Sequence, residues 1–238
     1  LFADQMPLLR KQAAAVVASL LADGLLKFRG SLTLRFLFLL GDPLQEVRGL
    51  AEVVVKRVLH RSHPSALSQH FADAVCAFNC WGGLGTLERP DTAFCLQDAP
   101  EQRALIYRFM LSIMNQEQRF AAFAQLVATL LTYFAEEAER LPLTMAEPAG
   151  QVLADALALV ACRELRCCLA TVPMHGNGGC RVSEDGHEFV DHAASQGSSQ
   201  EETARSRALL TVLRKNTREN VAPVLGKLRI VMQRTSSP

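Results

Sequence analysis

The sequence predicts an all-α fold, built as a solenoid of antiparallel helix pairs that stack side by side. The chain has 238 residues, of which 49% are hydrophobic, so it can bury a sizeable core. Leu and Ala dominate, and the β-branched residues do not gather into alternating runs, which favours helix over sheet. Apolar residues recur at spacings of three and four in successive segments joined by short turns. Helix pairs of this kind need neighbours to bury their apolar stripes.

The segment 41–59, GDPLQEVRGLAEVVVKRVL, carries the clearest repeat signature. We expect Asp42 to cap a helix, with Pro43 at the first helical position and Gln45 as the capping-box partner. The apolar stripe of this helix comprises Val47, Leu50, Ala51, Val54 and Val58. The spacing Asp-Pro-x-x-x-Val-Arg-x-x-Ala is that of the second helix of a HEAT repeat. The residues assigned to this signature are Asp42, Pro43, Val47, Arg48 and Ala51. An ordinary capped amphipathic helix of an unrelated helical domain is the alternative, because one short motif match leaves it open.

Further helices are expected on both sides of this segment. They cover residues 5–22, 32–40, 63–80, 101–114, 115–139, 147–168 and 202–216, with a last one opening near 220 and 223. In the first of them we expect an inward stripe of Leu8, Leu9, Val16, Leu20 and Leu21. Ser31 is expected to cap the second helix, and Asn115 with Gln118 to form a capping box. The residues expected to face inward from 63–80 are Leu67, Phe71, Ala74, Val75 and Phe78. Those expected inward from 101–114 are Leu105, Phe109 and Ile113.

Composition divides the chain into three parts. Residues 1–170 are expected to form HEAT-type repeats, with a surface loop at 81–100 where Gly and Pro interrupt the apolar periodicity. Residues 171–201 are rich in Gly, Ser and His and are expected to form a flexible insertion. Residues 202–238 are expected to form further HEAT-type helices, truncated at the end of the sequence.

Three features bear on the setting of the chain. The longest uncharged apolar run, 120–135, is shorter than the roughly 18 to 20 residues of a membrane span, so no span is expected. The sequence begins at Leu1 without a signal-peptide pattern, and we expect an internal segment of a longer protein. The seven Cys include no C-x-x-C pair, which suits thiols that act as small hydrophobes in a reducing compartment.

Four stretches carry a resemblance to a known family. They are RGSLTLRFLFLLGDPLQEVRGLAEVVVKRVL at 29–59, SALSQHFADAVCAFNC at 65–80, IYRFMLSIMNQEQRF at 106–120 and NVAPVLGKLRIVM at 220–232. These stretches resemble the D-type HEAT-repeat subunits of condensin II complexes. The sequence departs from the family in a shortened loop after Trp81 and in substitutions such as Gly226, so no contact residues are carried over.

The resemblance implies a non-catalytic scaffold or regulatory segment that supports mitotic chromosome condensation in the nucleus, on chromosomes. Its partners would be the SMC and kleisin subunits of the complex, with double-stranded DNA or chromatin, while ATPase activity would reside in the SMC subunits. No membrane and no small-molecule substrate are implied. The alternative is a general HEAT-repeat module for protein–protein interaction that makes no nucleic-acid contact.

Charge is segregated along the chain, although the net charge is only +1. It is +4 over residues 1–72, −10 over 73–204 and +7 over 205–234. Cations of the last segment can neutralise phosphates of duplex DNA with little sequence preference. The nucleic-acid-binding candidates are Arg214, Lys215, Arg218, Lys227 and Arg229. A solvated helix face is the rival explanation, and if the acidic middle of the chain forms a concave face, a basic peptide becomes the better partner.

Neither a metal site nor a catalytic site is expected. Cys76 and Cys80 lie four residues apart on one helix, and Cys180, His187 and His192 lie in the insertion, but neither set has the paired spacing of a structural zinc site. The sequence contains no P-loop, G-x-S-x-G, H-E-x-x-H or dinucleotide-binding fingerprint. We therefore expect no enzyme activity, no cofactor and no metal.

Overall fold

The structure is a computed structural model that describes residues 1–27, 29–82, 91–137, 140–141, 143–165, 211, 215 and 217–235. Every regular element in these ranges is helical, which confirms the all-α fold class. The elements are α1 (Pro7–Ala22), α2 (Gly30–Phe38), η1 (Leu39–Gly41), α3 (Gln45–Val53), η2 (Val54–Leu59), α4 (His60–Ser62), α5 (Ala66–Gln69), α6 (Phe71–Phe78), η3 (Thr92–Phe94), α7 (Pro100–Ile113), α8 (Gln116–Gln125), η4 (Leu126–Leu131), α9 (Thr132–Glu137), α10 (Pro148–Ala161), η5 (Thr217–Val221) and α13 (Ala222–Thr235).

Three of the longer helices contain a wider, π-helical turn. The turn η2 joins α3 to α4 in one continuous rod, η4 joins α8 to α9 in the same way, and η5 leads directly into α13. A π turn inserts one extra residue into a helix without ending it. The helix expected over 41–59 therefore runs from Gln45 to Ser62, and the one expected over 115–139 is described from Gln116 to Glu137.

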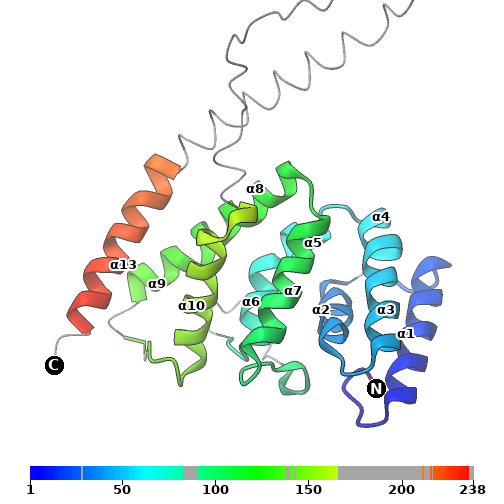
Figure 1. Ribbon diagram of the computed structural model, residues 1–238. Helices are drawn as coiled ribbons and strands as arrows, with labels where there is room; N and C mark the ends of the chain where they lie inside the picture. The colour runs from blue at the N-terminus through cyan, green and yellow to red at the C-terminus, as the bar shows by residue number, and fades with distance from the viewer. Residues whose placement is uncertain are drawn as a thin grey trace, which may run out of the picture.

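The helices form a row of antiparallel rods (Figure 1). In this view α1, α3 with α4, α7 and α10 run upward, whereas α2, α5 with α6, and α8 with α9 run downward. At the far end of the row α13 runs downward and packs against α9 and η4. This alternation is compatible with the expected solenoid, because each helix buries its apolar side against neighbours in the row.

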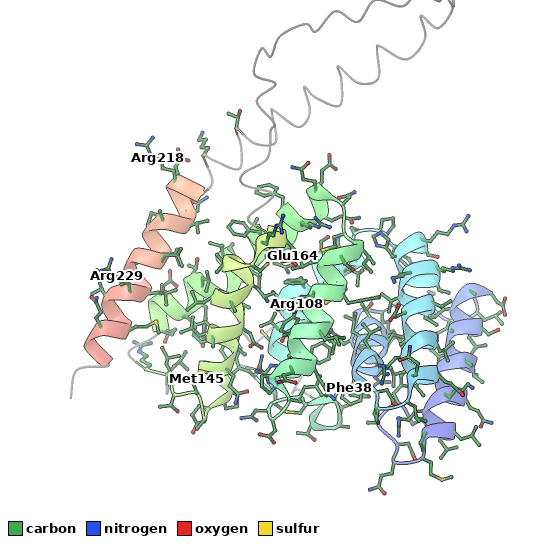
Figure 2. All side chains as sticks on the ribbon, viewed as in Figure 1. Phe38, Arg108, Met145, Glu164, Arg218 and Arg229 are labelled. Atoms are coloured by element: carbon green, nitrogen blue, oxygen red, sulfur yellow. The ribbon has the colours of Figure 1, made fainter. Side chains whose placement is uncertain are left out.

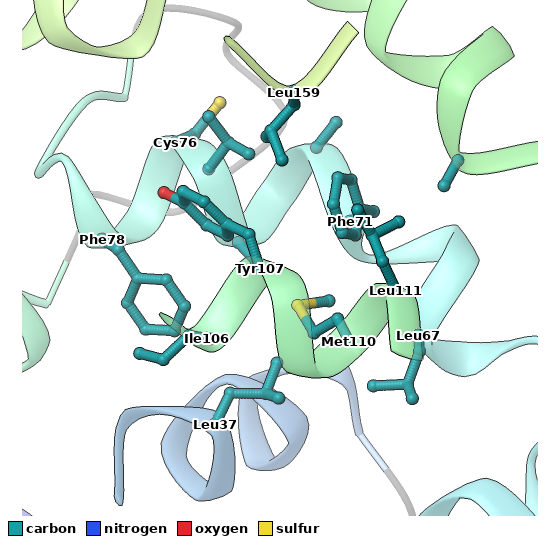
Figure 3. Packing of buried hydrophobic residues seen from close by; sticks show 14 of the residues in the cluster. Leu37, Leu67, Phe71, Cys76, Phe78, Ile106, Tyr107, Met110, Leu111 and Leu159 are labelled. Atoms are coloured by element: carbon teal, nitrogen blue, oxygen red, sulfur yellow. The ribbon is translucent and has the colours of Figure 1, made fainter. Parts of the chain in front are cut away.

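One apolar core follows the row from α1 to α13. In its middle, Leu37 of α2 lies close to Met110 and Ile106 of α7, and Tyr107 lies beside α6 (Figure 3). The residues expected to face inward from 63–80 are all buried: Leu67, Phe71, Ala74, Val75 and Phe78. The apolar periodicity of that segment therefore predicted its core face correctly. The segment is nevertheless two helices, because the backbone leaves helical geometry at His70.

The expected core face of α1 is wrong. Leu8 and Val16 are 59% and 58% exposed, whereas Ala14 and Ala18 are buried. The helix packs closely against α3 and η2, and the small Ala side chains permit that approach while larger ones would hold the helices apart. Of the five residues expected inward, Leu8, Leu9, Val16 and Leu20 are exposed, and Leu21 is partly buried against the core.

The expected core face of α7 is rotated by about one residue. Leu105 is 51% exposed, and Phe109 and Ile113 are only half-buried. The buried apolar face consists of Ile106, Tyr107, Met110 and Leu111. A buried arginine, Arg103, lies on the same face and fixes the rotation of the helix through the ion pair described below.

Besides Asp42, which is described below, two further residues were expected to cap helices. Asn115 and Gln118 form the expected capping box: the Gln118 amide donates to Asn115 Oδ1 at 2.8 Å, and the Asn115 amide donates to Gln118 Oε1 at 2.9 Å. Ser31 does not cap the second helix, because α2 begins at Gly30, two residues before the expected start at residue 32, with Arg29 at the N-cap position.

Parts of the expected chain division fall on residues that the structure describes. In the segment 81–100, Trp81 and Leu96 are buried, and the Leu96 amide donates to the carbonyl of Phe78 at 2.8 Å. The helix expected over 147–168 is described as α10, which ends at Ala161 because Cys162 is extended. The insertion at 171–201 and most of the helix at 202–216 lie outside the described residues. The division into three parts stays a prediction.

Two glycines give a matched test of packing. A Cβ on Gly150, near the start of α10, would lie 2.0 Å from the carbonyl oxygen of Thr144, so Gly150→Ala forces two backbone segments apart. We expect this substitution to lower the free energy of unfolding by about 1–3 kcal/mol. Gly49 in α3 has no such neighbour within 4 Å, and Gly49→Ala should raise that free energy by about 0.5–1 kcal/mol. Urea unfolding of both variants measures the difference, and a loss of stability in Gly49→Ala would contradict the packing described.

Candidate nucleic-acid interface

The repeat-signature residue Asp42 is not the N-cap of α3. Its carboxylate is buried and forms a bidentate ion pair with Arg10 of α1, with Nε to Oδ2 at 2.5 Å and Nη2 to Oδ1 at 2.9 Å. Leu44 occupies the N-cap position and the helix begins at Gln45, so Pro43 precedes the helix. The expected capping box is therefore wrong. A buried guanidinium without a carboxylate partner is very costly, and this outweighs the smaller gain from a helix cap.

The remaining signature residues serve packing and the turn. Val47 and Ala51 are fully buried in α3. The half-buried Arg48 donates through Nη1 to the carbonyls of Asp42 at 2.6 Å and Pro43 at 2.9 Å. Together with the Arg10 pair, these bonds fix the turn between the second and third helices. The geometry of the signature thus supports the fold.

A second buried ion pair joins three helices. Arg103 of α7 donates through Nε to Asp155 Oδ2 of α10 at 2.8 Å, and the same oxygen accepts from Tyr107 Oη at 3.2 Å and from Asn79 Nδ2 at 2.8 Å. The Arg103 Nη1 atom also donates to the carbonyls of residues 96 and 97. Burial raises the pKa of Tyr107 well above its usual value, so the phenol stays protonated and can donate. No sequence motif marks this network, because its members lie far apart in the chain.

The described candidates for nucleic-acid contact are all exposed. They are Lys215, Arg218, Lys227 and Arg229, whereas Arg214 lies outside the described residues. Val221 and Leu228 are buried, and Lys227 and Arg229, which flank Leu228, are exposed. Figure 2 shows Arg218 and Arg229 projecting outward from α13. Among the ion pairs of the described residues, none includes these four side chains.

Other exposed cations lie near the same edge of the row. The rod that ends with α4, the helix α10 and the start of η5 meet the upper edge in Figure 1. We call this the basic edge, and define it by the exposed cations Arg57, Arg61, Arg163, Lys215 and Arg218. Charge counted along the sequence did not group Arg163 with the others, because Arg163 lies in the acidic middle of the chain. The alternating direction of the helices is what brings these positions to one edge.

Acidic side chains are also present at the basic edge. They are Glu117 at the start of α8, Glu164 after the end of α10 and Glu219 in η5. Backbone hydrogen bonding lowers the pKa of Glu164, and the nearby Arg108 and Arg119 lower it further. At the opposite edge, the exposed acids Asp91, Asp98, Glu101 and Glu147 lie at or before the starts of α7 and α10. The two edges therefore differ in charge.

The basic segments near the two ends of the chain are not neighbours. The helices α3 and α4 lie near one end of the row and α13 lies at the other, with α7 and α10 between them (Figure 1). The basic edge therefore extends along the row. The cations of α13 continue it down that helix, away from the edge. An extended line of cations is suited to a long polyanion.

The cysteines, histidines and carboxylates do not gather into a metal site in the part of the chain that the structure describes. Within the described ranges, no group of three or more His, Cys, Asp or Glu side chains could hold a metal ion. Burial raises the pKa of the Cys76 thiol to about 12, and Cys180, His187 and His192 lie outside the described residues. In the same part of the chain, no helix has the length and apolar content needed to cross a bilayer.

The fold and the candidate surface define a class of protein: a helical-repeat-like scaffold with a basic edge. Among curated proteins, the chain is similar to condensin-2 complex subunit D3-L of Xenopus laevis, at 26% identity over 243 residues, and to condensin-2 complex subunit D3 of Mus musculus, at 27% over 243. It is also similar to condensin-2 complex subunit CAP-D3 of Arabidopsis thaliana, at 27% over 248 residues. The matches cover 99% of this chain but only 15–18% of the relatives. The predicted resemblance to condensin II D-type subunits is thus confirmed along nearly the whole chain.

Two further comparisons gave no match. No protein-family model matches the chain, and no solved structure matches it. The similarity to the three relatives is therefore a similarity of sequence.

The network around Asp155 can be tested against an exposed ion pair. In Asp155→Ala the guanidinium of Arg103, whose side chain is 3% exposed, loses its carboxylate partner. We expect the free energy of unfolding to fall by about 3–5 kcal/mol. Glu52→Ala, which removes the exposed pair with Lys56, should lower it by about 0.3–0.5 kcal/mol. Urea unfolding followed by helical circular dichroism measures both variants, and equal losses would contradict a special role for Asp155.

Proposed function

We propose that this chain is a segment of a non-catalytic scaffold subunit of a condensin-type complex, which supports mitotic chromosome condensation in the nucleus. The similarity to three condensin-2 D3 subunits, from a frog, a mouse and a plant, carries this proposal. The chain spans about 15–18% of their lengths, so the proposal assigns it one part of the work of a longer subunit.

The proposed protein partners are the SMC and kleisin subunits of that complex. A row of antiparallel helices supports this assignment, because it offers a long surface on which an extended peptide or a second subunit can lie. The buried ion pairs Arg10–Asp42 and Arg103–Asp155 stiffen the contacts between neighbouring helices of the row. A stiff row presents its surface with little loss of conformational entropy on binding.

The second part of the proposal is contact with double-stranded DNA through the basic edge and α13. Exposed guanidinium and ammonium groups without carboxylate partners can replace the counterions of the phosphate backbone. Such contacts carry little sequence preference, as a chromosome-organising scaffold requires. The chain itself would perform no chemistry.

An interaction module without nucleic-acid contact is the second candidate. The acidic edge favours it: Asp91, Asp98, Glu101 and Glu147 are exposed and would suit a basic peptide. In the first candidate function DNA occupies the basic edge, and in the second a basic peptide occupies the acidic edge. Charge reversal at the basic edge should weaken binding only in the first case.

The DNA contact is tested by the triple variant Lys215→Glu, Arg218→Glu and Lys227→Glu. If these cations and Arg229 contact about four phosphates, affinity for duplex DNA should fall about 100-fold between 50 and 200 mM salt in the unchanged protein. The triple variant should bind at least about tenfold more weakly at low salt and show a shallower salt dependence, because fewer counterions are released. Fluorescence anisotropy with a labelled duplex measures both quantities.

The matched control reverses three exposed cations outside the basic edge: Lys11 and Arg140, which pair with Glu46 and Glu137, and Arg35, which lies over the Phe94 ring. This control changes the net charge by the same amount but should leave DNA affinity within about twofold, because these cations lie away from the proposed contact. Unchanged affinity in the first variant would overturn the DNA contact and favour the interaction module. An equal loss of DNA affinity in the two variants would show that the effect comes from net charge and not from these particular cations.

A further inference from the structure

The end of α6 has an unusual backbone conformation. Cys80 has a φ of 58°, and it is the one residue other than glycine with a positive φ in the described part of the chain. The Cys80 amide donates to the carbonyl of Ala77 and the Trp81 amide donates to that of Cys76, both at 3.0 Å, which makes a Schellman motif. Glycine usually occupies this left-handed position, because a Cβ is disfavoured there. A cysteine that persists in such a position is an outlier that requires an explanation.

A second cysteine faces this turn. The Leu96 amide donates to the Phe78 carbonyl at 2.8 Å, which fastens the segment before α7 to the end of α6. The turn η3 is held by Phe94, whose ring packs edge-on against Phe38 with centroids 5.1 Å apart. The hydrogen bond and the ring contact position Cys95, and a side-chain hydrogen bond with Cys95 is among the interactions of the Cys80 thiol. Each of these cysteines is half-buried and free.

We propose that Cys80 and Cys95 form a reversible dithiol–disulfide pair, oxidised by a small-molecule disulfide such as oxidised glutathione. The thiolate of one cysteine attacks a sulfur of oxidised glutathione, which breaks that S–S bond and releases one glutathione thiolate. The thiolate of the other cysteine then attacks the protein sulfur of the mixed disulfide and releases the second glutathione. Two protein thiols lose two protons and two electrons, and one oxidised glutathione becomes two reduced glutathiones.

The pKa of the Cys80 thiol affects how readily the pair would react with the disulfide oxidant. Burial, as the largest cause, together with the neighbouring Cys95 thiol and Asp91 raises the pKa of Cys80 to about 11. The thiol form of Cys80 therefore dominates at neutral pH, which slows its exchange with the disulfide oxidant. The other described cysteines are placed differently: Cys76 is buried beside Tyr107 in the core (Figure 3), and Cys162 follows α10 at the basic edge.

The disulfide would close the segment between Cys80 and Cys95 and fix Trp81. The Trp81 ring stacks on Phe134 of α9 with centroids 5.0 Å apart and meets Tyr133 edge-on at 5.5 Å. Oxidation would thus tie α6 covalently to the segment that leads into α7, next to the contact with α9. Trp81 is the single tryptophan of the sequence, so its fluorescence reports on this site alone.

The test uses the reduced 238-residue chain incubated with oxidised glutathione. Peptide mapping without reduction should yield a Cys80–Cys95 linked peptide that dithiothreitol separates. The melting temperature should rise by roughly 5 to 10 °C on oxidation, as expected for closure of a loop of this size, and Trp81 fluorescence should be quenched. The Cys162→Ser control should behave like the unchanged chain.

The substitution Cys80→Gly keeps the fold testable, because glycine is favoured at the left-handed position. This variant and Cys95→Ser should both lack the linked peptide and the rise in melting temperature. The proposal is overturned if the unchanged chain gives no linked peptide while both thiols remain open to alkylation. It is also overturned if Cys80 or Cys95 pairs mainly with another cysteine.

Discussion

The carboxylate of Asp155 is the point on which the middle of the structure depends. It accepts hydrogen bonds from Asn79 at the end of α6 and from Arg103 and Tyr107 of α7, so one carboxylate of α10 joins three helices. A guanidinium as buried as that of Arg103 is tolerated only with a partner, and this requirement fixes the rotation of α7 and the position of α10. The Arg10–Asp42 pair does the same between α1 and the turn before α3. Apolar packing fills the space that these two pairs define.

The alternating direction of the helices also arranges charge. Helices that run upward end at the basic edge, where cations such as Arg61 and Arg163 lie near helix C-termini and stabilise the helix dipole. The same helices begin at the opposite edge, where Glu101 and Glu147 lie near helix N-termini and have the complementary effect. Each helix favours cations at its C-terminus and acids at its N-terminus. Because parallel members of the row share their direction, this preference gives the two edges of the row different charge. The DNA contact that we propose therefore uses cations whose position also stabilises the helices that carry them.

The similarity to condensin-2 D3 subunits and the basic edge are independent observations. The similarity rests on the sequence as a whole, whereas the basic edge comes from the direction of each helix and the exposure of its ends. The proposed Cys80–Cys95 disulfide is a third feature; it would link the end of α6 to the segment before α7 and stiffen the connection between the two helices. The functions proposed for this chain thus belong to an exposed surface and to the connection between two helices.

The sequence by itself determined the all-α class, the inward face of Phe71 and Phe78, and the capping box of Asn115, because these follow from contacts within a few residues. It also determined the family resemblance. Only the tertiary structure decided that Asp42 pairs with Arg10 instead of capping α3, and that α1 packs through its alanines. Buried charges and closely packed helices depend on partners distant in sequence, and helical periodicity contains no information about which partner is near. The same reason hid the juxtaposition of Cys80 and Cys95.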